Sequence, residues 1–144
     1  MKTSLLLLTG LTFLTLFSCK KLGCSDIDAI NYDSEVKPKN SSNCQYSGEV
    51  VFWHGQAVAE FLISDGATGL FYYVNGEMVG SASASTYWTG RPDCGANGSV
   101  TVTKELGAVK NKTYSYSIID QTGYEYASGV VNFTANTCQS VELN

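Results

Sequence analysis

Alternation of apolar and polar side chains dominates the chain from residue 48 onward. Residues 113–119 place Tyr114, Tyr116 and Ile118 on one face and serine or threonine on the other. Alternation with a period of two is typical of strands that bury one face. Apolar or alternating runs predict further strands at residues 49–53, 58–63, 70–74, 77–79, 99–104, 124–134 and 139–143.

Turn residues separate these runs. Asn75-Gly76 is the strongest of the turn signals, because an Asn-Gly pair between two strands favours a tight hairpin. Residues 91–98 form a loop, and residues 81–89 are either an edge strand or a long loop. No stretch has helical periodicity long enough for a crossover between parallel strands. The pattern therefore predicts an all-β fold, an antiparallel β-sandwich of seven to eight strands.

The first eighteen residues carry a different pattern. Lys2 precedes an apolar stretch rich in leucine, and the small residue Ser18 ends it. A basic start, an apolar middle and a small residue at the end are the parts of a secretory signal. The alternative is a membrane-spanning helix, which needs about 20 apolar residues. Residues 3–18 are fewer and include several threonines, so a signal is predicted.

The end of this stretch, Leu16-Phe17-Ser18-Cys19, resembles the signal of bacterial lipoproteins. The resemblance implies that Cys19 receives a diacylglycerol and becomes the first residue of the mature protein. Stable anchoring takes more than one acyl chain, which such a lipid supplies. Lys20 stands where an aspartate would resemble a signal for retention in the inner membrane. We therefore expect an outer-membrane lipoprotein of a Gram-negative bacterium, on the periplasmic or the cell-surface face.

The cysteine count agrees with lipidation. The chain has five cysteines, and an odd count leaves one unexplained. If Cys19 carries lipid, Cys24, Cys44, Cys94 and Cys138 remain, and an even set in an exported protein favours disulfides. Three pairings are open, and we favour the local one, Cys24–Cys44 with Cys94–Cys138. A zinc site is disfavoured because the chain has no CxxC pair and a single histidine, and no metal or other cofactor is predicted.

Residues 23–46 resemble a short motif of secreted and surface proteins of Gram-negative bacteria, GC-[ST]-D-x-x-A-x-N-Y followed by C-x-Y. The chain departs from this motif at residues 35–43, which lack its usual acidic pair. The resemblance implies a module outside the cytoplasm and no known catalysis.

The same segment offers oxygen ligands for calcium. Asp26, Asp28, Asn31 and Asp33 lie close together in sequence, although their spacing is not that of an EF-hand. In the alternative interpretation Asp26 caps a short turn, and the other three side chains face solvent. The apolar neighbours Ala29, Ile30 and Tyr32 would then pack on the disulfide.

A second resemblance concerns the β region. Tyr73-Val74-Asn75-Gly76-Glu77-Met78-Val79-Gly80 is similar to the V-x-G-x-x-x-G hairpin of transthyretin-like and PEGA-like extracellular sandwiches. The later Tyr114-Ser115-Tyr116 strand and the cysteine of the last strand, Cys138, follow the pattern of the same domains. The resemblance covers about residues 48–144 and implies a transthyretin-like or immunoglobulin-like fold without indicating a ligand.

These patterns divide the chain into a signal at residues 1–18, a lipidated tether at residues 19–47 and a β-sandwich at residues 48–144. Removing the signal takes away one lysine and no acidic residue, so the net charge falls from −4 to −5. A nucleic-acid-binding domain needs a basic face. We therefore expect a membrane partner through the lipid and no nucleic-acid partner.

Side chains suited to catalysis are sparse. His54 is the single histidine, and no nucleophile or orienting group stands beside it in the sequence, which favours an exposed turn residue. Pairs of carboxylates serve glycoside hydrolysis, but most acidic residues here fall at turns or strand ends. Those considered are Glu60, Asp65, Glu77, Asp93, Asp120 and Glu125. No catalytic residue is predicted.

Tyrosine and tryptophan together number eleven, and some of them must fill the core. We expect Tyr114 and Tyr116 in the core. The surface candidates are Trp53, Tyr72, Tyr87, Trp88, Tyr124 and Tyr126. Exposed rings can stack on sugars or form a protein interface, and Tyr87-Trp88 is the first candidate ligand site. The alternative is that this pair packs against the core under a long loop.

The function expected from these observations is a lipid-anchored cell-envelope protein with a non-catalytic β-sandwich that binds a protein or glycan or serves a structural role. The alternative is a carbohydrate-binding or carbohydrate-active accessory protein.

Overall fold

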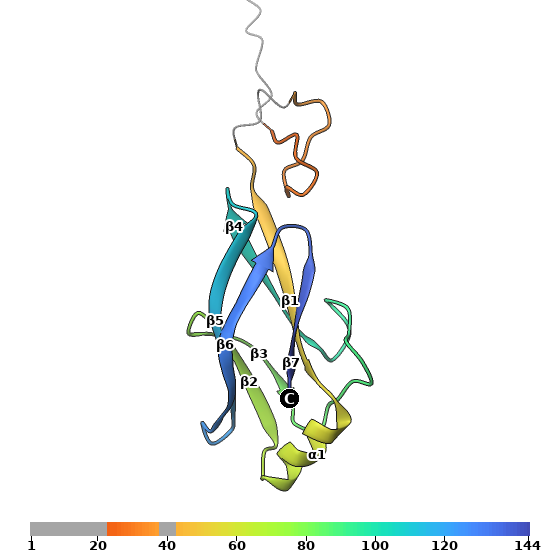
Figure 1. The fold of residues 1–144 in the computed structure, drawn as a ribbon, viewed down its shortest axis with the longest axis vertical. Coiled ribbons are helices and arrows are strands. Elements are labelled where there is room, and N and C mark those ends of the chain that lie inside the picture. Colours follow the sequence, from red (N-terminus) through yellow and green to blue (C-terminus); the bar gives the residue numbers. More distant parts are fainter. Residues whose placement is uncertain (1–22, 38–42) are drawn as a thin grey trace, which may run out of the picture.

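The computed structural model describes residues 23–37 and 43–144, so the predicted signal and Cys19 lie outside the described residues. Seven strands and one helix follow one another along the chain (Figure 1). They are β1 (Tyr46–His54), α1 (Gln56–Ser64), β2 (Gly69–Val74), β3 (Glu77–Ser83), β4 (Val100–Gly107), β5 (Asn111–Asp120), β6 (Glu125–Thr134) and β7 (Cys138–Leu143).

The strands form two sheets that face each other. One sheet has the order β4-β1-β7, and the other has the order β3-β2-β5-β6. These seven strands confirm the predicted all-β sandwich. The pairing is antiparallel except between β1 and β7, which run parallel. The expectation of a purely antiparallel sandwich is therefore wrong for this one pair of strands, in which β7 runs in the same direction as β1.

The core fills the space between the sheets. The Phe52 ring of β1 lies 5.5 Å from the Tyr72 ring and 5.6 Å from the Tyr116 ring, which belong to the opposite sheet. Tyr114 meets Phe133 edge to face at 5.4 Å. Tyr114 and Tyr116 thus pack against the core, as predicted.

Tyr72 is a correction to the sequence analysis, which placed it among the surface aromatics. Its side chain is 2% exposed, because Leu70, Tyr72 and Val74 occupy alternate positions of β2 that all face inward. Burial raises the pKa of the Tyr72 hydroxyl to about 12, since a phenolate would lose its hydration there.

The hairpin predicted at Asn75-Gly76 joins β2 to β3. Both residues have positive φ, 55° for Asn75 and 79° for Gly76, as the tight hairpin turn favoured by Asn-Gly requires. β3 continues to Ser83, so the open alternatives for residues 81–89 resolve into the end of an edge strand followed by a loop.

The strand predicted at residues 58–63 is wrong, because these residues belong to helix α1. Ala59 and Leu62 are its buried residues, and their spacing of three matches one face of a helix. An apolar run of six residues fits a buried strand or one face of a short helix equally well, and here packing selects the helix.

The end of α1 is fixed by a glycine. Gly66 has a φ of 91°, and the N–H of Ala67 donates to the Leu62 carbonyl at 2.9 Å. This is the Schellman arrangement, in which a left-handed residue lets the chain satisfy the last helical carbonyls. Leu62 and Ala67, the two ends of this hydrogen bond, are both buried, as is common for this arrangement. The chain leaves α1 here and continues into β2.

The loop between β3 and β4 packs against the three-stranded sheet. The disulfide Cys94–Cys138 joins it to the start of β7, and the Trp88 N–H donates to the His54 carbonyl of β1 at 3.0 Å. Val50 and Phe52 of β1 face the core between the sheets, so Val51 between them faces the outer side of its sheet. Val51 is nevertheless fully buried. The loop therefore covers the outer face of this sheet.

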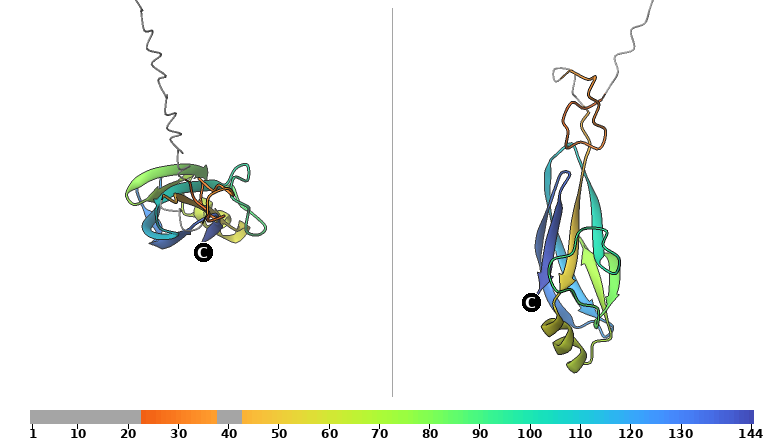
Figure 2. Two further views of the ribbon diagram at one scale, coloured as in Figure 1. Left: turned by 90° about the horizontal axis from the view of Figure 1, so that it is seen from above. Right: turned by 90° about the vertical axis from the view of Figure 1, so that its right-hand side faces the viewer.

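Residues 23–37 lie at one end of the elongated molecule, and α1 lies at the other end (Figures 1 and 2). The disulfide Cys24–Cys44 closes this segment on itself just before β1, so both predicted disulfides are present. The described residues contain no helix long and apolar enough to cross a membrane.

Candidate binding site

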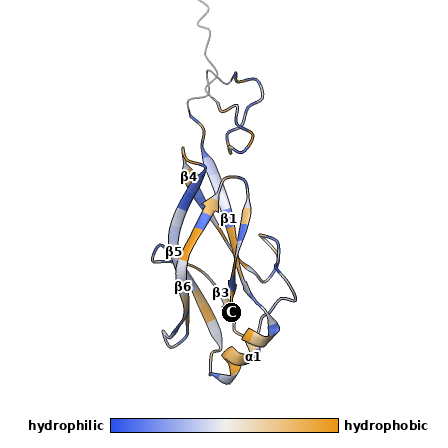
Figure 3. Ribbon diagram, viewed as in Figure 1, coloured by the Kyte–Doolittle hydropathy of each residue, from blue (hydrophilic) through white to orange (hydrophobic). Residues whose placement is uncertain are grey.

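A groove of about 300 Å³ opens at the end of the sandwich where α1 meets the last two strands. Figure 3 shows that most of α1 is hydrophobic. The groove is lined by Ala57, Val58, Phe61 and Leu62 of α1, Tyr126 of β6, and Leu143 and Asn144 at the end of β7. Elements far apart in the sequence thus form one mostly apolar depression, which is the usual character of a ligand site.

Three aromatic rings form a row beside this groove. Phe61 meets Tyr126 edge to face at 6.4 Å, and Tyr126 meets Tyr124 at 5.0 Å. Phe61 is 57% exposed and Tyr124 is 60% exposed. Grouped exposed rings, unlike isolated ones, are typical of interaction surfaces. Tyr124 and Tyr126 were both surface candidates, whereas Phe61 was assigned to a strand and its part in the groove was missed.

The polar end of Tyr126 is held in place. Its hydroxyl donates to Asp65 Oδ2 at 2.7 Å, and this hydrogen bond, followed by burial, raises the pKa of Tyr126 to about 12. The bond ties the residue just after α1 to β6 and fixes the ring that separates Phe61 from Tyr124.

The turn between β5 and β6 positions Tyr124. Asp120 Oδ1 accepts hydrogen bonds from the N–H groups of Thr122 and Tyr124 and from the Thr122 hydroxyl, at 2.7–2.9 Å. These donors, with the Thr122 hydroxyl the strongest, hold the pKa of Asp120 below its ordinary value. Asp120 is therefore a structural residue of this turn.

The other carboxylates considered for catalysis contact ordinary surface partners. Glu77 pairs with Lys104 at 3.1 Å, Glu60 accepts from Gln56 and Glu125 accepts from Ser128. Asp93 belongs to the exposed loop before Cys94. These contacts spread the carboxylates over separate elements, and no described contact joins two of them.

His54 is a correction, since an exposed turn residue was expected. It is 2% exposed, because it ends β1 and alternates with the inward-facing Val50 and Phe52. Its Nε2 lies 3.3 Å from the Ala84 carbonyl oxygen. Burial lowers the pKa of His54 in spite of this contact, which favours the neutral ring.

Tyr87 and Trp88 do not form one exposed surface. Tyr87 is 46% exposed, whereas Trp88 is half-buried and lines a small hollow together with the half-buried Trp53 and with His54. Only the Tyr87 ring is freely presented, so a ligand site at this pair stays a prediction.

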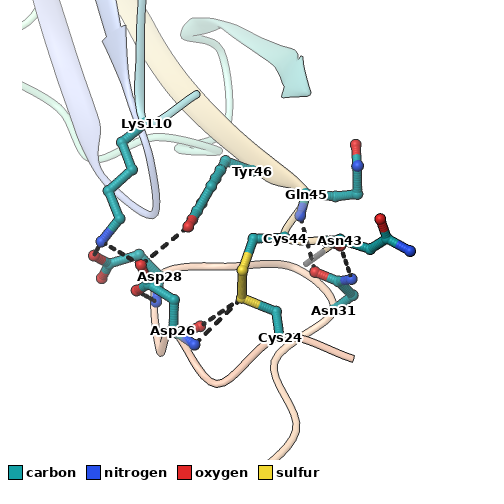
Figure 4. The surroundings of a disulfide bond; sticks show 9 residues. All are labelled: Cys24, Asp26, Asp28, Asn31, Asn43, Cys44, Gln45, Tyr46 and Lys110. Carbon is teal, nitrogen blue, oxygen red and sulfur yellow. Dashed lines mark hydrogen bonds and ion pairs between the residues drawn. A yellow bond between two sulfur atoms is a disulfide. The ribbon is translucent and has the colours of Figure 1, made fainter. Parts of the chain in front are cut away.

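The acidic residues of the N-terminal segment contact a lysine (Figure 4). Lys110, in the turn between β4 and β5, lies 2.7 Å from Asp26 and 2.8 Å from Asp28. Asp26 also accepts from the Tyr46 hydroxyl at 3.0 Å and caps a turn by accepting from the Asp28 N–H. The Lys110 hydrogen bond is the main cause that lowers the pKa of Asp26.

These contacts bear on the calcium alternative. A lysine among the carboxylates opposes a cation there, and the Asn31 side chain bonds the Gln45 N–H and the Asn43 carbonyl. Ile30 and Tyr32 are largely exposed, so of the apolar residues expected to pack on the disulfide only Ala29 is buried. Within residues 23–37 and 43–144, no group of three His, Cys, Asp or Glu side chains is placed to hold a metal ion.

Comparisons with protein-family models, curated proteins and solved structures gave no match for this chain.

Proposed function

We propose that this chain is a lipid-anchored protein of the bacterial cell envelope whose β-sandwich is a non-catalytic binding module. Cys19 carries the lipid, and the outer membrane is the location. The observation that supports the proposal best is that the groove is lined by α1, and α1 lies at the end of the molecule opposite residues 23–37 (Figure 1). Those residues follow Cys19 closely in the sequence.

The N-terminal segment is attached firmly enough to set the orientation. The Cys24–Cys44 disulfide and the ion pairs of Lys110 with Asp26 and Asp28 hold it against the sandwich. β1 then spans nine residues from this segment toward α1, which is about 30 Å of extended chain. A lipid on Cys19 thus presents the groove away from the membrane, where partners can reach it.

Cell fractionation tests the anchor. Wild type is expected in the membrane fraction and extractable only with detergent, and Cys19→Ser is expected in the soluble envelope fraction with its fold retained. A Cys19→Ser variant that remains membrane-bound would contradict the proposal. Protease treatment of intact cells then places the wild-type sandwich on the cell surface if it is digested, or on the periplasmic face if it is protected.

A glycan is the second candidate ligand, since Tyr87 presents a 46% exposed ring of the kind that stacks on sugars. A glycan array probed with wild type and Tyr87→Ala tests it. Loss of a specific signal in Tyr87→Ala would support sugar binding, and an array without signal would argue against it.

A further inference from the structure

The groove end of the molecule carries acidic side chains without basic ones. Glu60 precedes Phe61 on α1, and Asp65, just after α1, accepts the hydrogen bond of the groove residue Tyr126. Glu125 and Glu142 precede Tyr126 and Leu143 on their strands, so their side chains lie on the other face of β6 and β7. Neither residues 46–90 nor residues 113–144 contain a lysine or arginine. The elements that line the groove therefore carry acidic side chains and no lysine or arginine.

The basic side chains lie toward the other end. Lys110 pairs with the N-terminal segment, Lys104 pairs with Glu77, and Arg91 donates to the Cys138 carbonyl at the start of β7. Lys112 stands over the Tyr114 ring at 5.2 Å, near the beginning of β5. Within the described part of the chain, neither Glu60 nor Asp65 forms an ion pair with a lysine or arginine.

The mostly apolar lining of the groove favours an apolar ligand group. Its volume of about 300 Å³ is at the lower limit of small-molecule pockets and suits one or two apolar side chains. The exposed rings of Phe61 and Tyr124 flank it, and such rings attract lysine and arginine through their faces. An apolar side chain next to a cationic one would satisfy both features.

We infer that the groove binds a basic segment of a partner protein, one that inserts an apolar side chain beside Lys or Arg residues. This inference rests on the proposed function and names the partner chemistry of the same site. Complementary charge supports it, because the carboxylates of Glu60 and Asp65 beside the groove attract a cationic segment. The same charge repels nucleic acid, anionic lipid surfaces and acidic glycans.

Peptide binding to the mature Cys19→Ser chain tests the inference, measured by fluorescence anisotropy. The probes are a labelled peptide with a central leucine pair flanked by lysines and the same peptide with glutamates in place of the lysines. The lysine peptide is expected to bind at least about tenfold more tightly than the glutamate peptide, with an affinity that falls as salt rises. Equal affinities, or affinities independent of salt, would overturn the inference.

Variants locate the site. Glu60→Gln is expected to weaken the lysine peptide about two- to fivefold. Glu105→Gln, which neutralises an exposed carboxylate of β4 far from the groove, is the matched control and should leave binding unchanged. Phe61→Ser should weaken binding as well, and circular dichroism confirms its fold, since Phe61 is mostly exposed.

The outcomes separate this inference from the proposed function. If Phe61→Ser weakens both peptides equally and the glutamine variant changes nothing, the groove is an apolar site and the charge inference is wrong, while the binding module stands. If neither peptide binds, the inference is wrong, and the proposed anchor is judged separately by fractionation of Cys19→Ser.

Discussion

Replacing Cys94 and Cys138 together by serine removes the covalent link between the β3–β4 loop and β7. The two residues are 44 positions apart, and closing a loop of this length restricts the unfolded chain by about 4 kcal/mol in the chain-entropy description. Small domains have total stabilities of about 5–15 kcal/mol. The double variant should therefore lose a large part of its stability.

Urea denaturation followed by tryptophan fluorescence measures the effect. The midpoint should fall clearly, and the slope with urea should rise because the unfolded chain without its cross-link exposes more surface. A free energy of unfolding that drops by less than about 1 kcal/mol, with an unchanged slope, would refute the reasoning.

The other disulfide provides the control. Cys24 and Cys44 are 20 positions apart, which corresponds to about 3 kcal/mol if their loop unfolds together with the sandwich. The segment lies at the end of the molecule, outside both sheets (Figure 2), so its loss should mainly free residues 23–37. The midpoint of Cys24→Ser with Cys44→Ser should fall less than that of the Cys94 and Cys138 variant.

Three further predictions concern packing and titration. Gly48→Ala should cost roughly 1–3 kcal/mol of stability in urea denaturation, because its new methyl group would lie 2.5 Å from the Thr134 carbonyl oxygen; Gly90→Ala, with nothing within 4 Å, should be neutral. Because the pKa of His54 is lowered in the folded state, the unfolded chain takes up a proton first as the pH drops. The free energy of unfolding should therefore fall by up to about 1.4 kcal/mol per pH unit below pH 6.5. In His54→Gln this contribution to the pH dependence of stability should be absent. The pKa of about 12 for Tyr126 means that its stabilising effect is complete below pH 10 and is lost as pH rises through 12; Tyr126→Phe should show a smaller loss over that range.

The sequence predicted the strands well where local chemistry decides them. Alternation in residues 113–119 and the Asn75-Gly76 turn each involve neighbouring residues, and both predictions agree with β5 and the β2–β3 hairpin. The two disulfides are those of the local pairing, which was favoured among three open pairings. The parallel partnership of β1 and β7 joins residues such as Glu49 and Cys138, and no local pattern encodes such a distant register.

The groove was missed for a related reason. It needs Phe61 on a helix next to Tyr126 and Leu143, which come from strands far along the chain. A signal for the helix was present in the spacing of Ala59 and Leu62 and in the glycine just after the run. Had α1 been predicted, Phe61 would have been placed opposite its buried face and recognised as exposed.

The place of β1 between the two ends of the molecule has a mechanical consequence. β1 starts beside the N-terminal segment, and Gly55 alone separates it from α1. A pull between a membrane anchor and a partner held at α1 would act along the length of this strand. Because both ends of the load would be attached to the same extended strand, its covalent backbone would carry the tension, and its hydrogen bonds to β4 and β7 would not have to break. Tension of this kind would therefore leave the pairing of the strands in both sheets intact.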